Sequence, residues 1–416
     1  SLLILFLLFC MFPLGYLESL RWPFPGPRAT HGLLKGLFLV LSVVMIVFRK
    51  QLGKSKNPVQ SLLMVFFLLA YTFSAAFSQA PSSSLLNLWY PFISFSILYA
   101  FSLIKIERKY IYLLIALSSI LVFLTFIFSF FSLLFRYSVD NIYYFMFLEH
   151  RANHLLQELR FYGKYVSLGP YIFFVPLATT FLIEKGSSLS RKGLSIFMLL
   201  VSVLIAVISN NRIDFLIIAF QLLCVLFLLP KKLAVTLLIA VIPIIYFGLM
   251  TTELFFGFSL EERLLRPKIE RDIETVDIRF TYWETALYNF QKFPIFGTGP
   301  NTYNDVSVFP IRRYYNQGAQ DYLYRIDEGI GIHNVFFERL SDTGLAGFIT
   351  FITLLLFFAR KDFLEIIRRK DPESRKIYFL FALSSWTWIM YGITDNGYGA
   401  QGFVTFFFLR GVVDHV

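Results

Sequence analysis

The sequence contains little charge and little cysteine. Charged residues make up 16% of its 416 positions, whereas hydrophobic residues make up 57% and phenylalanine alone occurs 51 times. A soluble fold cannot bury that much apolar surface, because an average globular chain carries a much smaller apolar share. The two cysteines, Cys10 and Cys224, both lie inside apolar runs, where burial as a small hydrophobic side chain is the ordinary outcome. The composition therefore excludes a soluble enzyme, and we assign neither a disulfide nor a metal site to the cysteines.

The apolar runs are long enough to cross a bilayer, which takes on the order of 20 mostly apolar residues. They predict an all-α integral membrane protein with about twelve transmembrane helices. The expected spans are 2–19, 33–48, 61–78, 86–104, 111–135, 166–183, 194–209, 213–229, 233–252, 333–358, 376–394 and 400–413. The first run lacks a charged leader and many spans follow it, so we interpret it as a helix and not as a signal peptide.

Lysine and arginine gather in every second loop between these spans. Because positive segments resist translocation, such loops mark the cytoplasmic side. The basic loops lie at 49–56, 105–109, 185–192, 231–232 and 360–376. Their positive excess accounts for the formal net charge of +11, so the basic balance reports topology and gives no support to a nucleic-acid partner. Both termini should then be cytoplasmic, although the first outside loop carries Arg21, Arg28 and Lys35.

Two of the predicted extracytoplasmic segments are long. The segment 136–165 mixes aromatic and charged residues with an apolar spacing that suits a helix at the membrane interface. The segment 253–332 is the only sizeable polar region and should be mainly helical. The predicted organisation is therefore 1–252 with nine spans, 253–332 as a large loop, and 333–416 with three spans. We expect function to be concentrated at the large loop.

Arg212 and His333 stand at the mouths of two predicted spans. Arg212 lies in SNNRIDF, in a loop so short that its guanidinium group must stay near the membrane surface, and the alternative is an arginine that snorkels to the headgroups. His333 begins a span in GIHNVFFERLSDTGLAGF, and the alternative is an interfacial imidazole that caps local backbone. Histidine is the side chain best suited to take a proton at neutral pH. Glu338 and Asp342, spaced i,i+4, are expected to orient Arg339 or the histidine.

Arg279 lies near the start of DIRFTYWETALYNFQKFPIFGTGPNTY. Apolar residues recur there at helical spacing up to Phe290, and a stretch at 294–300 with a proline at each end then breaks the pattern. We therefore expect a short amphipathic helix followed by a turn. Gly297 and Gly299 fit the turn, because no βαβ unit surrounds them and a dinucleotide fingerprint requires one.

The remaining polar residues give weaker signals. His150 and His154 form the only close histidine pair and lack the intervening glutamate of a metalloprotease helix, so we interpret them as structural. Auxiliary phosphate contacts, with solvated surface charge as the alternative, are Arg151, Arg160, Lys164 and Arg339. No metal site is predicted. The large loop has no DxD spacing for a divalent ion, so a bound diphosphate would need arginines.

Arg212 in its short loop, Arg279 with RFTYWETALYNFQKFPIFGTGPNTY, and HNVFFERLSDTGLAG form an ordered set. In this order they resemble the O-antigen ligase and polymerase superfamily of bacterial membrane glycosyltransferases, closely over 209–347. The resemblance implies a GT-C-like fold in the inner membrane, with the active site on the periplasmic face. It also implies a glycan on undecaprenyl diphosphate as donor, the sugar of lipid A-core as acceptor and no cofactor. The family's two arginines map onto Arg212 and Arg279, and its histidine maps onto His333.

These residue types fit the implied chemistry. An arginine fork matches phosphate oxygens and keeps its charge, so two arginines can hold the donor diphosphate without a metal. His333 would take the proton of the acceptor hydroxyl, which predicts a single displacement with inversion at the sugar.

Other functions stay open at this point. An O-antigen polymerase would use the same donor with a second lipid-linked glycan as acceptor, and a protein O-glycosyltransferase of the superfamily is a third possibility. From another class, a polyisoprenyl-lipid or solute transporter would also have about twelve helices. The spans are poor in mid-helix charge and no two halves match, which disfavours the transporter.

Overall fold

The computed structural model describes residue 7 and residues 27–48, 57–107, 109–113, 115–116, 175–208, 212–256, 269–303, 332–393 and 399–416. Within these ranges the chain is helical and contains no strand, as the sequence predicted. The helices are α2 Pro27–Val47, α3 Pro58–Ala76, α4 Pro81–Asn87, α5 Trp89–Leu103, α9 Thr180–Ile183, α10 Leu189–Ile208, α11 Arg212–Leu228, α12 Lys231–Phe256, α14 Ile269–Lys292, α18 Val335–Arg368, α19 Pro372–Gly392 and α20 Gly399–Val413. The predicted segment 136–165 lies outside the described residues, as do most of the spans predicted at 2–19 and 111–135.

Several helices have the length and composition of membrane spans. Three are long and apolar enough to cross a bilayer, and they are Pro58–Ala76, Pro81–Leu103 and Val335–Arg368. Shorter apolar helices occupy Lys35–Val47, Ile213–Leu228 and Phe403–Val413. The chain is therefore a membrane protein with an all-helical described part, and the full number of twelve spans stays a prediction.

Helix α3 shows which environment its outer surface is suited to. Its exposed side is a stripe of large apolar residues at helical spacing, namely Leu62, Val65, Phe66, Leu69 and Phe73. Its buried side includes the polar residues Gln60, Tyr71 and Ser74. A helix in water has the opposite arrangement. Apolar side chains outside and polar side chains inside are what a lipid environment requires, because an inward polar group finds partners within the bundle.

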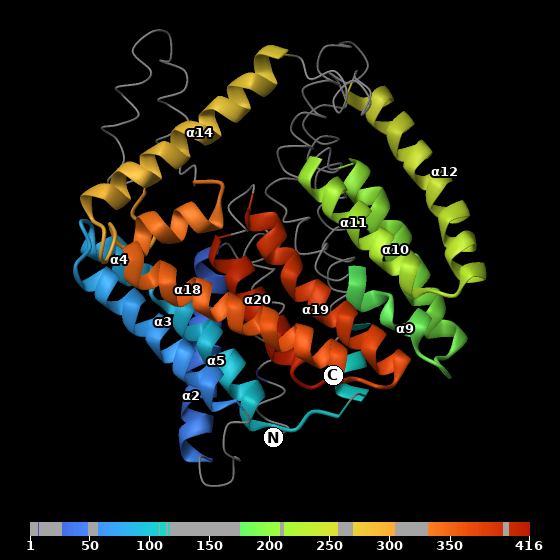
Figure 1. Cartoon of the computed structure of the whole chain (residues 1–416), viewed down its shortest axis with the longest axis horizontal. Coiled ribbons are helices and arrows are strands. Elements are labelled where there is room, and N and C mark those ends of the chain that lie inside the picture. The colour runs from blue at the N-terminus through green and yellow to red at the C-terminus, as the bar shows by residue number, and fades with distance from the viewer. Residues whose placement is uncertain are drawn as a thin grey trace.

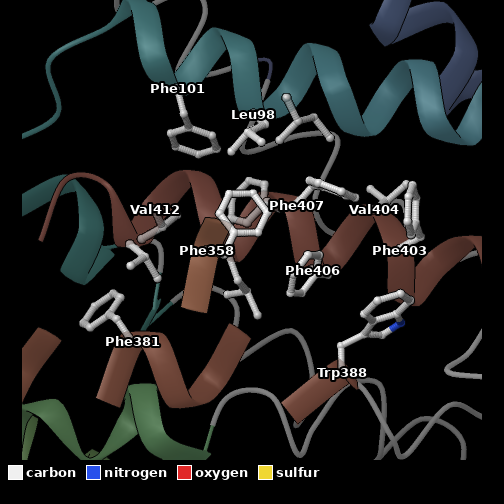
Figure 2. Packing of buried hydrophobic residues seen from close by; sticks show 14 of the residues in the cluster. Leu98, Phe101, Phe358, Phe381, Trp388, Phe403, Val404, Phe406, Phe407 and Val412 are labelled. Carbon is white, nitrogen blue, oxygen red and sulfur yellow. The ribbon is translucent and has the colours of Figure 1, made fainter. Parts of the chain in front are cut away.

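Helix α20 lies at the centre of the larger apolar cluster. The residues Phe403, Phe406, Phe407 and Phe408 are all at most 2% exposed, so the helix is covered on every side. Its neighbours are α5 and α19, and Figure 2 shows Phe101 of α5, Phe358 of α18 and Trp388 of α19 packed around it. Because lipid tails are as apolar as these rings, close van der Waals packing stabilises this arrangement in a bilayer.

A second apolar cluster joins α9, α10, α11 and α12 (Figure 1). Leu380 and Tyr391 of α19 belong to it, whereas Phe381 and Trp388 of the same helix belong to the first cluster. Helix α19 therefore connects the two groups. Helix α14 packs on the start of α18 beside the first group, and this contact builds the candidate site.

Candidate functional site

Two aromatic contacts hold α14 against the start of α18. The ring of Trp283 stacks on Phe337 with centroids 5.4 Å apart, and its indole N–H donates to the carbonyl oxygen of Ile332 at 3.2 Å. The ring of Tyr282 stacks on the imidazole of His333 with centroids 6.0 Å apart. The amphipathic helix predicted in this segment is therefore confirmed, and its aromatic face lies on the first turn of α18 and on the residues just before it.

His333 has a left-handed backbone conformation with a φ of 53°. The next residue, Asn334, is the N-cap of α18, because its side-chain oxygen accepts hydrogen bonds from the N–H groups of Phe336 (2.9 Å) and Phe337 (3.1 Å). Its side-chain nitrogen donates to the carbonyl oxygen of Ile393 at 2.8 Å, just beyond the end of α19. A non-glycine residue in this conformation costs on the order of 1–3 kcal/mol and needs surrounding structure to hold it. The capping bonds and the tyrosine stack supply that structure.

The two predicted arginines differ in how far the structure defines them. Arg279 lies on α14 one turn before Tyr282, and its side chain is partly exposed. Residues three apart share a helix face, so Arg279 and the tyrosine that stacks on His333 lie on the same side of α14. Arg212 is the first residue of α11, and its side chain lies outside the described part of the structure. The predicted residues Arg151 and Arg160 also lie outside the described residues.

Arg339 is buried, with 8% of its surface exposed. One terminal nitrogen lies 3.1 Å from a carboxylate oxygen of Glu338, and the other donates to the hydroxyl of Tyr71 in α3. Its guanidinium group also lies over the rings of Tyr71 and Phe403, 5.5 and 5.4 Å from their centroids. Solvated surface charge is therefore the wrong interpretation for Arg339.

Helix α18 is broken at Gly344, where the backbone leaves the helical region with a φ of 58° and a ψ of −160°. In an unbroken helix, the N–H groups of residues 345 and 346 would donate to the carbonyls of residues 341 and 342. The loop Pro294–Gly299 that follows α14 pairs with all four groups instead. The N–H groups of Leu345 and Ala346 donate to Pro294 (2.8 Å) and Ile295 (3.1 Å), and the carbonyls of Ser341 and Asp342 accept from Thr298 (3.0 Å) and Gly299 (2.9 Å).

Glycines in α18 and in the Pro294–Gly299 loop allow these two backbones to pair. A Cβ atom on Gly344 would lie 2.5 Å from the carbonyl oxygen of Ile295, and one on Gly297 would meet the backbone of Asp342. Gly297 and Gly299 both have positive φ, 70° and 113°. The prediction that they form a turn is therefore confirmed, and their conformation also lets two backbones meet without side chains between them.

Asp342 joins three segments at this junction. Its carbonyl oxygen also accepts a hydrogen bond from the hydroxyl of Ser74 in α3 at 2.7 Å. One carboxylate oxygen accepts from the N–H of Asn301 at 2.9 Å. The N-terminal part of α18 is thereby fixed both to α3 and to the segment that follows α14.

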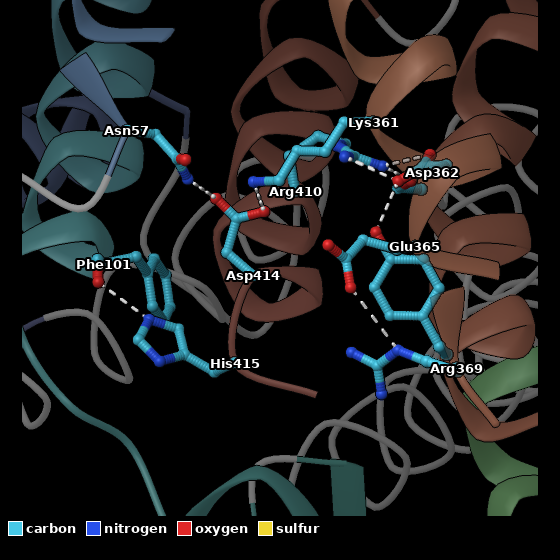
Figure 3. A network of polar contacts seen from close by, with 11 residues as sticks. Asn57, Phe101, Lys361, Asp362, Glu365, Arg369, Arg410, Asp414 and His415 are labelled. Atoms are coloured by element: carbon cyan, nitrogen blue, oxygen red, sulfur yellow. Dashed lines mark hydrogen bonds and ion pairs between the residues drawn. The ribbon is translucent and has the colours of Figure 1, made fainter. Parts of the chain in front are cut away.

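A second polar cluster, which the sequence analysis passed over, lies toward the C-terminal ends of α18 and α20 (Figure 3). Arg410 is fully buried and binds Asp362 through two hydrogen bonds of 2.7 and 2.9 Å. The same carboxylate accepts from Tyr378 at 2.9 Å and from Trp386 at 2.7 Å. A single arginine inside the last predicted span was the available signal, because a charge in that position needs a buried partner. The described residues contain no group of three His, Cys, Asp or Glu that could hold a metal ion.

The middle of the chain is similar to known proteins. The sequence profile of the O-antigen ligase family matches residues 188–352, from just before α10 into α18. An uncharacterized protein of Haemophilus influenzae is 29% identical over 140 residues, which are 32% of this chain and 34% of that protein. The chain thus spans about a third of the length of the curated relative that it matches. Because the matched range contains Arg212, Arg279 and His333, the resemblance to the O-antigen ligase superfamily that their motifs predicted is confirmed over these residues.

Proposed function

We propose that this protein is an O-antigen ligase of the inner membrane, which transfers a glycan from undecaprenyl diphosphate to lipid A-core in the periplasm. The observation that carries the proposal is the family match over 188–352, since members of this family are glycosyltransferase-like enzymes. The contact between α14 and the start of α18 supports it, because the same contact brings the Arg279 face of α14 to His333.

In the proposed reaction, Arg212 and Arg279 bind the donor diphosphate. Each guanidinium group can donate two parallel hydrogen bonds to phosphate oxygens, and both keep their positive charge as negative charge grows on the leaving group. Arg279 suits this role because its side chain is partly exposed on the face of α14 that leads to His333. This mechanism uses arginine charge where other transferases use a divalent ion.

His333 is the general base in this proposal. Its imidazole takes the proton of the acceptor hydroxyl while that oxygen attacks the anomeric carbon. The bond from this carbon to the diphosphate oxygen breaks, and undecaprenyl diphosphate leaves with the electron pair. The ring of Tyr282 stacks on one face of this imidazole. A single displacement of this kind inverts the configuration at the sugar.

The acceptor separates the ligase from its nearest alternative, the polymerase. Purified protein in nanodiscs is given a lipid-linked glycan and excess chelator, with and without lipid A-core. We expect extended lipid A-core and no elongated lipid-linked glycan. Elongated lipid-linked glycan alone would instead identify a polymerase. In sealed proteoliposomes, movement of the donor across the bilayer without transfer would identify a transporter.

The same assay tests the assigned residues. We expect His333→Ala and Arg279→Ala to lower the transfer rate at least about 100-fold. General base catalysis contributes on the order of 10²–10⁴, and one donor that stabilises developing charge contributes on the order of 10²–10³. Both variants should insert and fold as the wild type does, since the two side chains are only partly buried. A purified variant with near-normal transfer would remove that residue from the mechanism.

A further inference from the structure

Three aromatic rings form a row at the contact between α14 and α18, and we call Phe280, Trp283 and Phe337 the aromatic row. The ring planes of Phe280 and Trp283 meet at 75°, with centroids 5.3 Å apart. Trp283 stacks on Phe337 at 19° and 5.4 Å, and its indole N–H donates to the carbonyl oxygen of Ile332 at 3.2 Å. The indole is therefore fixed by contacts on two sides, and Phe280 is supported by the indole.

Phe280 is the open end of the aromatic row. It is 53% exposed, whereas Trp283 and Phe337 are partly buried. Eight of the 24 residues of α14 are charged, and a helix with this many charges lies outside the hydrocarbon layer. The exposed ring of Phe280 therefore lies among polar groups, and its neighbours decide what it can bind.

The aromatic row lies beside the α14 residues that the proposed function uses. Residues three or four apart share a helix face, so Arg279 lies next to Tyr282 and Trp283. Tyr282 in turn stacks on the imidazole of His333, with centroids 6.0 Å apart. In the proposed reaction, the anomeric carbon lies between the diphosphate on Arg279 and the acceptor oxygen at His333. The sugar that contains this carbon is therefore expected close to the aromatic row.

We propose that Phe280, supported by Trp283, binds the sugar ring that is bonded to the donor diphosphate. One face of a pyranose consists mainly of C–H groups, and their partial positive charge is attracted by the negative face of an aromatic ring. The sugar would pack on Phe280 while Arg279 holds the phosphates. The inference rests on the proposed function, which assigns Arg279 to the diphosphate. Because this contact takes part in no bond change, it contributes to donor binding and not to the chemical step.

The test compares how two lipids bind to the purified protein in detergent, namely undecaprenyl diphosphate with the glycan and undecaprenyl diphosphate without sugar. Phe280→Leu keeps an apolar side chain but removes the ring. We expect the dissociation constant of the glycan-carrying lipid to rise about 2- to 12-fold, the range that ring stacking contributes beyond apolar burial. Binding of the sugar-free lipid should not change. Phe280→Tyr keeps the ring and should bind both lipids as the wild type does, whereas Arg279→Ala should weaken both.

Tyr288→Leu is the matched control. Tyr288 also lies on α14 and is 48% exposed, but it follows Phe280 by more than two helical turns. This variant should bind both lipids as the wild type does. In the transfer assay, Phe280→Leu should raise the KM for the donor with kcat unchanged, because the lost contact is made equally before and during the reaction.

Three results overturn the sugar contact. They are unchanged binding in Phe280→Leu, equal weakening of both lipids in Phe280→Leu, and equal loss in Phe280→Leu and Phe280→Tyr. A wild-type protein that binds the glycan-carrying lipid more tightly than the sugar-free lipid, but transfers no glycan, overturns the proposed function instead. The two failures are therefore distinguishable.

Discussion

At the residue scale, Gly344 carries the clearest structural requirement. Its φ of 58° and ψ of −160° fall in a region that only glycine adopts readily, and a Cβ atom there would lie 2.7 Å from the N–H nitrogen of Gly297. We predict that Gly344→Ala lowers the free energy of unfolding by at least about 1–3 kcal/mol, the usual cost of such backbone strain. Denaturant unfolding of the purified protein in detergent, followed by circular dichroism, measures the change.

Gly193 offers a control for this substitution. It lies inside α10, and nothing lies within 4 Å of the position that its Cβ atom would take. Alanine should therefore be neutral or stabilise the protein by roughly 0.5–1 kcal/mol, because glycine is the weaker helix former. Equal unfolding free energies for Gly344→Ala and Gly193→Ala would show that the break in α18 does not depend on a glycine.

The glycines of this region show which local features could be predicted from the sequence. The turn at Gly297 and Gly299 was predictable, because prolines flank them and the apolar period stops there. The break at Gly344 was not, since DTGLAG continues an apolar run that a regular helix also satisfies. The burial of Arg339 could not be predicted either, because its partner Tyr71 is 268 positions away along the chain.

At the element scale, α3 adds a hydrogen bond to the backbone pairing between α18 and the Pro294–Gly299 loop. Ser74 donates its hydroxyl hydrogen to the carbonyl oxygen of Asp342 at 2.7 Å, and both residues are buried. We predict that Ser74→Ala lowers the free energy of unfolding by about 0.5–1.5 kcal/mol, the usual net contribution of one hydrogen bond. Thermal unfolding of the protein in nanodiscs would register the loss.

Thr72 of the same helix is the matched control for Ser74. Its hydroxyl donates to the carbonyl oxygen of Leu68 within α3 at 2.8 Å, and its side chain is exposed. Thr72→Ala therefore removes a hydroxyl hydrogen bond of similar length without touching α18. We expect its unfolding temperature to stay close to that of the wild type, and an equal decrease in both variants would contradict a special role for the Ser74 bond.

Hydropathy predicted the described helices well but not all of their ends. Helices α3, α11, α19 and α20 begin and end within a few residues of the predicted spans. Helix α18 runs ten residues past the predicted end at 358, because the charged residues that end an apolar run are themselves good helix formers. Charge thus marks where a span leaves the apolar layer and does not mark where the helix stops.

At the scale of the whole molecule, two polar clusters lie toward opposite ends of α18. One contains the pair of Glu338 and Arg339, and the other is the buried pair of Arg410 and Asp362. The second cluster binds α18 to α19 and α20 through Tyr378, Trp386 and Arg410, and removing one partner of such a pair typically costs about 3–5 kcal/mol. At the other end of α18, the side chains of Arg279, His333 and Glu338 are partly exposed.

The predicted orientation places the end with His333 in the periplasm and the end with Arg410 near the cytoplasm. Gln291 on α14 and Ser188 before α10 are exposed and should lie on opposite sides of the membrane. In a chain with Cys10 and Cys224 replaced by serine, we predict that Gln291→Cys reacts with a membrane-impermeant maleimide added to cells whose outer membrane alone is permeable. Ser188→Cys should react only after the inner membrane is opened, because basic loops resist translocation. Labelling of Ser188→Cys with the inner membrane intact would invert the topology and move the proposed reaction to the cytoplasmic face.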